Sequence, residues 1–218
     1  KVPFVVRDPY QKKRGVVSNA MVSHVDITPS LLDFAGALDL ENNRPKNYVS
    51  PKAYWKDKGY AAKENRGGRH KFDTYHGRSW LSILPKNDHP EWGKIFASHT
   101  FHEIQMYYPM RVIRDRNFKL IWNIAHGLPY PFASDLWASS TWQAQLEKGK
   151  DAPYGGKTVD EYVNRPAFEL YAIDKDPNES NNLANNPEYA NVLKKYQDML
   201  KEHQKELNDP WITKWRYE

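Results

Sequence analysis

The stretch MRVIRDRNFKLIWNI, residues 110–124, predicts two antiparallel strands joined by a tight turn. Met110–Asp115 and Phe118–Ile124 have the apolar and β-branched composition of strands, and Arg116-Asn117 lies between them as the turn. Successive side chains of a strand point to opposite faces of the sheet, so alternate residues share a face. In the second strand this rule gathers four apolar side chains on one face: Phe118, Leu120, Trp122 and Ile124.

The C-terminal segment has the pattern of a helix that covers such a face. It is predicted to begin near Asn186-Pro187 and to end near Asn208. Apolar residues at helical spacing form one stripe along it: Tyr189, Val192, Leu193, Tyr196, Met199, Leu200 and Leu207. Two further strands are predicted at Lys94–Ser98 and Phe168–Ile173. Antiparallel strands with a terminal helix packed across them give an α+β fold class.

Residues 1–43 have a different pattern. Val2–Val6 predicts a buried strand, and a chain that opens inside a strand is expected to be cut from a longer one. A short helix follows, with Thr28 as the expected N-cap, Gly36 as the expected end and Asp26 ordering its start. Three apolar residues of this helix are expected to face inward: Leu31, Leu32 and Ala35.

Residues 44–78 predict a long exposed loop. Lys and Arg outnumber Asp and Glu there, aromatic residues lie among them, and neither a helical nor a strand period persists. Long loops in compact enzymes are often functional, and this one could hold an anionic chain. The alternative is a solvated loop that covers a domain interface.

The composition excludes several classes of site. The chain has no Cys, which excludes disulfides, thiolate zinc sites and cysteine nucleophiles. With 39% hydrophobic and 14% aromatic residues it can form a core, and no apolar run has the length of a membrane span. There are 32 Lys and Arg against 27 Asp and Glu, a net charge of +5, which suits an anionic partner.

Two motifs resemble the sulfatase family, within the alkaline-phosphatase-like superfamily. Residues 22–36, VSHVDITPSLLDFAG, are similar to the segment that follows the catalytic half of sulfatases. Glu169-Leu170-Tyr171, with Asp176-Pro177 and Asn182-Leu183-Ala184, resembles the closing strand and turn of the family. Between them, residues 98–111 resemble the sulfatases that hydrolyse the sulfamate of glucosamine in heparan-type glycans.

The resemblance implies three regions. Residues 1–36 would be a remnant of the α/β sulfatase catalytic domain, containing its last strand and helix. Residues 37–93 would be the basic aromatic loop and connection, and residues 94–218 the C-terminal subdomain of antiparallel sheet and helix.

The resemblance also implies cofactors and partners. Sulfatases use a formylglycine nucleophile and a calcium ion, and the sequence contains no motif for either. Both are therefore expected in an N-terminal catalytic part of the same sulfatase, which would be the partner of this chain. The chain alone is expected to be inactive and to shape specificity for a sulfated glycan. Neither a nucleic acid nor a membrane is expected as a partner, and the expected location is periplasmic or secreted.

Four residues are candidates for substrate binding by this resemblance. His102 and Glu103 are expected to face the substrate pocket and to hydrogen-bond the sugar or the scissile nitrogen. The alternative is that both residues lie in a loop and hydrogen-bond only to the backbone. Met106 excludes the HExxH zinc motif. His99 is a further candidate for the pocket wall that His102 and Glu103 would form. Arg111 could bind a sulfate or carboxylate, and a salt bridge to a local acid is its alternative. No catalytic residue and no metal ligand are expected in this chain.

Other functions remain open at this point. One is an O-sulfatase or a phosphodiesterase of the same superfamily. The identity of the nucleophile in the expected N-terminal part would distinguish a sulfatase from a phosphodiesterase. Another is a non-catalytic module that binds anionic polysaccharide through residues 44–78. Nucleic-acid binding has only the charge in its favour, because no recognised motif accompanies it.

Overall fold

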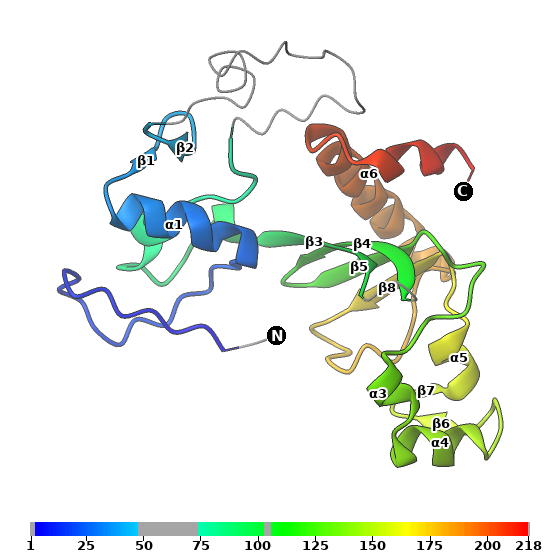
Figure 1. The fold of residues 1–218 in the computed structure, drawn as a ribbon. Helices are drawn as coiled ribbons and strands as arrows, with labels where there is room; N and C mark the ends of the chain where they lie inside the picture. Colours follow the sequence, from blue (N-terminus) through cyan, green and yellow to red (C-terminus); the bar gives the residue numbers. More distant parts are fainter. Residues whose placement is uncertain (1–2, 48–73, 103–105, 218) are drawn as a thin grey trace, which may run out of the picture. The chain divides into compact units, whose positions relative to one another are not determined.

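The computed structural model describes residues 3–47, 74–102 and 106–217, which form two compact units, Lys1–Gly93 and Lys94–Glu218 (Figure 1). The predicted division into 1–36, 37–93 and 94–218 stays a prediction. Of the predicted loop 44–78, residues 48–73 lie outside the described residues.

The second unit is built on a four-stranded antiparallel sheet with the strand order β3-β4-β5-β8. Its strands are β3 (Lys94–Phe101), β4 (Tyr107–Asp115), β5 (Phe118–Asn123) and β8 (Phe168–Ala172). The central pairing places Ile113 opposite Leu120, and Leu120 opposite Leu170. All four strands were predicted, and the hairpin turn at Arg116-Asn117 is confirmed.

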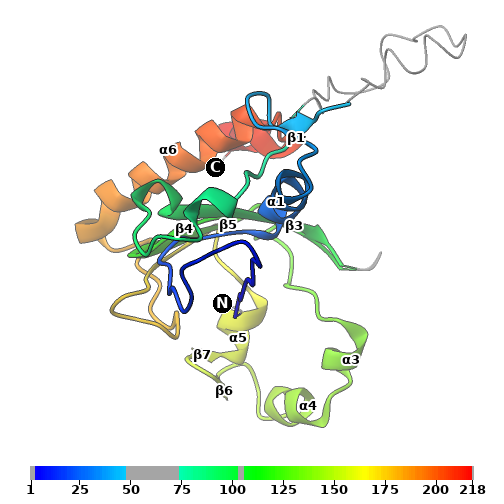
Figure 2. The same cartoon turned by 90° about the vertical axis from the view of Figure 1, so that its left-hand side faces the viewer.

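The long helix α6 (Ala190–Glu206) lies across one face of this sheet, after the short 3-10 turn η4 (Pro187–Tyr189) (Figures 1 and 2). Tyr196 and Leu200 are buried against Leu120 and Trp122 of β5, and Leu193 packs at the edge of this core. Burying such a side chain contributes about 1.5–3 kcal/mol. The predicted stripe is therefore confirmed except for Leu207, which follows the end of α6 and is not part of this core. The α+β class is confirmed.

An insertion between β5 and β8 lies on the side of the sheet opposite α6 (Figure 2). It contains α3 (Ser134–Trp137), α4 (Ser140–Leu146), the hairpin β6 (Pro153–Tyr154) and β7 (Lys157–Thr158), and α5 (Val159–Val163). Trp142, Ala152 and Val159 form its small core. Thr158 and Glu161 form a capping box that fixes the start of α5 directly after β7. A last 3-10 segment, η5 (Pro210–Arg216), follows α6.

Within its described residues, the first unit contains α1 (Ile27–Phe34), the strand pair β1 (Leu38–Asp39) and β2 (Arg44–Pro45), and three 3-10 turns. The turns are η1 (His24–Asp26), η2 (Leu81–Ile83) and η3 (Pro90–Trp92). The Asp26 carboxylate accepts the backbone N–H of Ser23 at 2.7 Å and of Arg78 at 2.9 Å, which orders the turn η1 directly before α1, although it makes no side-chain capping bond to α1 itself. Gly36, with a φ of +67°, takes the left-handed conformation that ends the helix.

Three expectations for this unit were wrong. Residues 3–6 form no strand, so the described part of the chain lacks the last strand of an α/β domain there. Asp26, rather than Thr28, is the N-cap. The buried face of α1 is Pro29 and Ser30, while Leu31 is 59% exposed. The Ser30 hydroxyl explains this orientation, because it donates to Asp26 O at 2.6 Å and accepts the Trp80 N–H at 3.0 Å.

Candidate functional site

His99 and His102 lie at the end of β3, where a bulge interrupts its pairing with β4. His99 is half-buried and its Nδ1 donates to the carbonyl of Tyr108 at 3.0 Å. The side chain of His102 is exposed, and its backbone N–H donates to Met106 O at 3.3 Å. Glu103 lies outside the described residues. Substrate binding by these three residues stays a prediction.

Arg111 is engaged elsewhere. It is buried, its Nε and Nη2 donate to the two oxygens of Asp209 at 2.5 and 3.0 Å, and its Nη1 donates to Met110 O at 2.8 Å and His99 O at 3.2 Å. Burial would raise the pKa of Asp209, but hydrogen bonds from Arg111, the Trp211 N–H and Gln204 hold it below the ordinary value. The geometry favours the salt-bridge alternative for Arg111, although its acid is distant in sequence.

A pocket of about 410 Å³ lies in the second unit, between the sheet and the insertion. It is lined by Lys119, Ile121, Tyr154, Gly155, Gly156, Lys157, Tyr162, Arg165, Glu169, Tyr171, Asn178 and Glu179. The turn Gly155-Gly156 joins β6 to β7 and passes close to Ser180. A Cβ on Gly156 would lie 2.0 Å from Ser180 Oγ, so only glycine permits this wall of the pocket.

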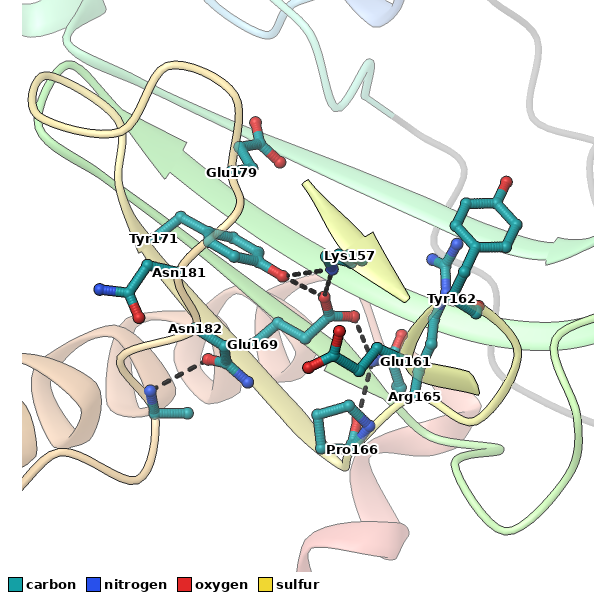
Figure 3. Close-up of polar contacts among 12 residues, drawn as sticks. Lys157, Glu161, Tyr162, Arg165, Pro166, Glu169, Tyr171, Glu179, Asn181 and Asn182 are labelled. Carbon is teal, nitrogen blue, oxygen red and sulfur yellow. Dashed lines mark hydrogen bonds and ion pairs between the residues drawn. The ribbon is translucent and has the colours of Figure 1, made fainter. Parts of the chain in front are cut away.

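The floor of the pocket is an ion pair around Glu169, which is 2% exposed (Figure 3). Lys157 Nζ donates to Glu169 Oε2 at 2.8 Å and to the Tyr171 hydroxyl at 2.6 Å. The Tyr171 hydroxyl donates to the same Oε2, and Asn123 Nδ2 donates to Oε1 at 2.8 Å. Both carboxylate oxygens are therefore occupied within the protein.

These contacts shift two pKa values in opposite directions. Burial would raise the pKa of Glu169, but the hydrogen bonds from Lys157, Tyr171 and Asn123 outweigh it and hold this pKa below the ordinary value. Burial and the bond to Glu169 raise the pKa of Tyr171. At neutral pH the floor therefore consists of a carboxylate, an ammonium and a neutral phenol.

Arg165 stands at the rim of the pocket beside Tyr162 (Figure 3). Its guanidinium carbon lies 3.6 Å from the ring centroid of Tyr130 and 5.1 Å from that of Tyr162, and its Nε donates to Tyr162 O at 3.3 Å. Aromatic faces attract a cation in this position. Within the described residues no carboxylate pairs with it.

The sequence alone did not single out Lys157 or Arg165, and Glu169 and Tyr171 were noted only for the family resemblance. The lining residues come from β5, β6, β7, α5, β8 and the loops between and after them, so no single sequence spacing links them. In the described ranges, no group of three or more His, Asp or Glu side chains could hold a metal ion. No helix described here has the length and apolar character needed to cross a membrane.

The predicted resemblance to sulfatases is confirmed by sequence comparison. Over 215 residues, 96% of the chain, it is 33% identical to N-sulphoglucosamine sulphohydrolase of Homo sapiens. It is 26% identical over 198 residues, 89% of the chain, to an ulvan-active sulfatase of Formosa agariphila. The chain is thus related to sulfatases, and within them it is similar to a sulfohydrolase of N-sulfoglucosamine.

The chain spans 38% of the length of the human relative and 31% of the ulvan-active sulfatase, and the match is to the C-terminal part. A solved structure of BT4656 in complex with its substrate D-glucosamine-2-N,6-O-disulfate aligns with 90% of this chain and 26% of its own. Its TM-score is 0.49 and its sequence identity 20%. No family model matches the chain.

Proposed function

We propose that this chain is the C-terminal portion of a sulfatase that hydrolyses the N-sulfate of glucosamine in heparan-type glycans. The observation that carries the proposal is the 33% identity to N-sulphoglucosamine sulphohydrolase across 96% of the chain. The motifs that suggested it, residues 22–36 and 98–111 and the closing Glu169-Leu170-Tyr171, are spread over the length of that match.

In this proposal the chain supplies specificity rather than the chemistry of sulfate transfer. The calcium ion and the formylglycine nucleophile of a sulfatase would come from an N-terminal part of the same enzyme. The residues that this chain would contribute are His99 in β3, His102 directly after it, and Glu103. A histidine can donate or accept a hydrogen bond and a glutamate can accept one from a hydroxyl or a sugar nitrogen. The enzyme would act in the periplasm or outside the cell.

A second candidate is a sulfatase with another specificity, such as an O-sulfatase. The 26% identity to an ulvan-active sulfatase over 89% of the chain favours it. The weaker similarity places this candidate second.

The test is a panel of sulfated sugars offered to an enzyme that carries this chain as its C-terminal part. We expect sulfate release from a non-reducing N-sulfoglucosamine, and none from the 218-residue chain alone. Release from 6-O-sulfate only would favour the second candidate. Turnover of an aryl sulfate by the isolated chain would show that it contains its own nucleophile.

A further inference from the structure

We propose that the pocket between the sheet and the insertion is a binding site for an anionic saccharide unit, one that carries a sulfate or a carboxylate. The proposed site lies in the second unit, and the residues that form it are not His99, His102 or Glu103. The proposal stands on the pocket's own geometry and charge and does not depend on which bond the enzyme hydrolyses.

The first argument is the size and composition of the pocket. Its volume of about 410 Å³ falls within the range of small-molecule sites, which are mostly apolar with a few oriented polar groups. Tyr154 and Tyr162 supply aromatic surface, with ring centroids 4.8 Å apart and planes at 72°. The hydroxyls of a sugar need donors and acceptors beside such rings, and the pocket provides both types in Asn178 and Lys157.

The second argument is that the walls are fixed. The Lys157–Glu169 pair and the Tyr171 hydroxyl lock the floor, and the close approach of Gly156 to Ser180 fixes one side. Glu179 at the opposite rim adopts a φ of +54°, a conformation that is uncommon for a non-glycine residue, and accepts Lys119 Nζ at 2.5 Å. A site whose side chains are already held by their neighbours loses little freedom when a ligand enters.

The third argument is charge. Three cations line the pocket, and two of them have carboxylate partners: Lys119 pairs with Glu179 at 2.5 Å and Lys157 with Glu169 at 2.8 Å. Arg165 is the remaining cation and, within the described residues, has no acid partner. Its fork of N–H groups suits a sulfate or carboxylate, which it can bind through two hydrogen bonds. Lys157 has a third N–H beyond its two contacts, and its side chain is 27% exposed.

These groups specify the ligand by its chemistry. A neutral sugar would leave the Arg165 guanidinium without a counter-charge, and a cationic ligand would be repelled by the excess of positive charge in the pocket. A free inorganic anion would use Arg165 but none of the aromatic surface of Tyr154 and Tyr162. A saccharide unit with one anionic group uses both.

The experiment is a two-dimensional NMR titration of the 218-residue chain. Four probes are compared: glucosamine N-sulfate, glucuronate, N-acetylglucosamine and inorganic sulfate. We expect at least one of the anionic sugars to shift the Arg165 Nε–H signal and the amides of Gly156 and Tyr162, with an affinity about 10-fold or more above that of the neutral sugar. Binding of glucosamine N-sulfate alone would assign a sulfate site, and of glucuronate alone a carboxylate site.

The variant Arg165→Gln keeps a polar side chain and removes the charge. It should weaken binding of the anionic sugar about 10- to 100-fold, the usual loss for a hydrogen bond to a charged group. Arg165→Lys should retain part of the affinity because it retains the charge. Lys148→Gln, an exposed residue of the same unit outside the pocket, is the matched control and should bind as the parent chain does.

Four results would overturn the proposal: equal affinity for the neutral sugar, equal affinity for inorganic sulfate, binding that Arg165→Gln leaves unchanged, or chemical-shift changes confined to residues outside the pocket lining. Chemical-shift mapping on the unmodified chain keeps the test valid if a variant fails to fold, because the mapping alone shows whether the shifted residues line the pocket. Since the readout is binding, failure here leaves the proposed hydrolysis untouched, and failure of the hydrolysis leaves this site untouched.

Discussion

Arg111 and Asp209 form a two-point ion pair that ties the central strand β4 to the segment after α6, with Nε–Oδ2 and Nη2–Oδ1 distances of 2.5 and 3.0 Å. Each side chain is only 9% exposed. Gln204, buried near the end of α6, donates to the same Asp209 at 3.1 Å and accepts from Trp215 Nε1 at 2.7 Å. The pair therefore holds the helix and the following 3-10 segment on the sheet.

We predict that Asp209→Asn destabilises the chain by about 3–5 kcal/mol, because it leaves a buried guanidinium without its counter-charge. Urea unfolding followed by circular dichroism measures this change. The matched control is Asp198→Asn, which breaks the exposed Lys194–Asp198 pair and should leave the stability almost unchanged, because solvent screens such a surface pair. A loss as small for Asp209→Asn as for the control would contradict the structural role of Arg111.

The stability of the second unit should fall in acid. The pKa values of Glu169 and Asp209 are held below the ordinary values of 4.5 and 3.8, so both groups bind protons more weakly in the folded state than in the unfolded chain. Their contribution is therefore complete above about pH 5 and is lost as the pH falls through the folded pKa values.

Glu169→Gln tests this dependence directly. The variant should be less stable than the parent at pH 7, because Lys157 loses its counter-charge, and its stability should fall less steeply between pH 5 and pH 3. Unfolding midpoints in urea across that range provide the measurement. Parallel pH profiles for the variant and the parent would show that Glu169 does not contribute to the acid response.

Gly156 should tolerate no side chain. A Cβ there would lie 2.0 Å from Ser180 Oγ and 2.7 Å from Ser180 Cβ, so Gly156→Ala must move the β6–β7 turn or the loop that carries Ser180. We expect a loss of about 1–3 kcal/mol by analogy with overpacking in cores. Gly127→Ala is the control, since a Cβ at Gly127 has no neighbour within 4 Å.

The added variant Ser180→Gly separates a local clash from a general effect of alanine. Removing the Ser180 side chain from Gly156→Ala should recover most of the lost stability, measured as the thermal unfolding midpoint. If the double variant is no more stable than Gly156→Ala, the close approach of these two residues is not the cause.

The sequence predicted the sheet and α6 because their patterns are long and regular. Phe118, Leu120 and Trp122 alternate on β5, and Tyr196 and Leu200 recur at helical spacing, so each element reveals its buried face locally. The insertion was not predicted, because β6 and β7 have two residues each and are held by contacts around Trp142 rather than by local preference.

Where the sequence misled, a tertiary contact decided the outcome. The apolar residues 3–6 satisfy a strand pattern but pair with no strand in the described part of the chain. Leu31 fits an inward-facing stripe, yet the hydrogen bonds of Ser30 to Asp26 and Trp80 turn a different side of α1 inward. The pocket around Glu169 could not be foreseen for a related reason: Lys157 and Arg165 reach it from segments that no motif connects.

The sharpest functional prediction concerns His102, whose side chain is exposed at the end of β3. In an enzyme that carries this chain, we expect His102→Ala and Glu103→Gln to impair turnover of an N-sulfated glycan more than turnover of a small aryl sulfate. The sulfate group would be handled by the N-terminal part for both substrates, whereas only the glycan has a sugar ring to place against these residues.

Losing one hydrogen bond to a bound sugar costs about 1–3 kcal/mol, which corresponds to a decrease of about 5- to 150-fold in kcat/KM for the glycan. The measurement is kcat/KM for both substrates, together with the unfolding midpoint of each variant. His126→Ala, a histidine outside β3 in the same unit, is the control and should leave the ratio of the two kcat/KM values unchanged. Equal losses on glycan and aryl sulfate with a lowered midpoint would assign His102 to the scaffold, because a structural residue supports both reactions alike.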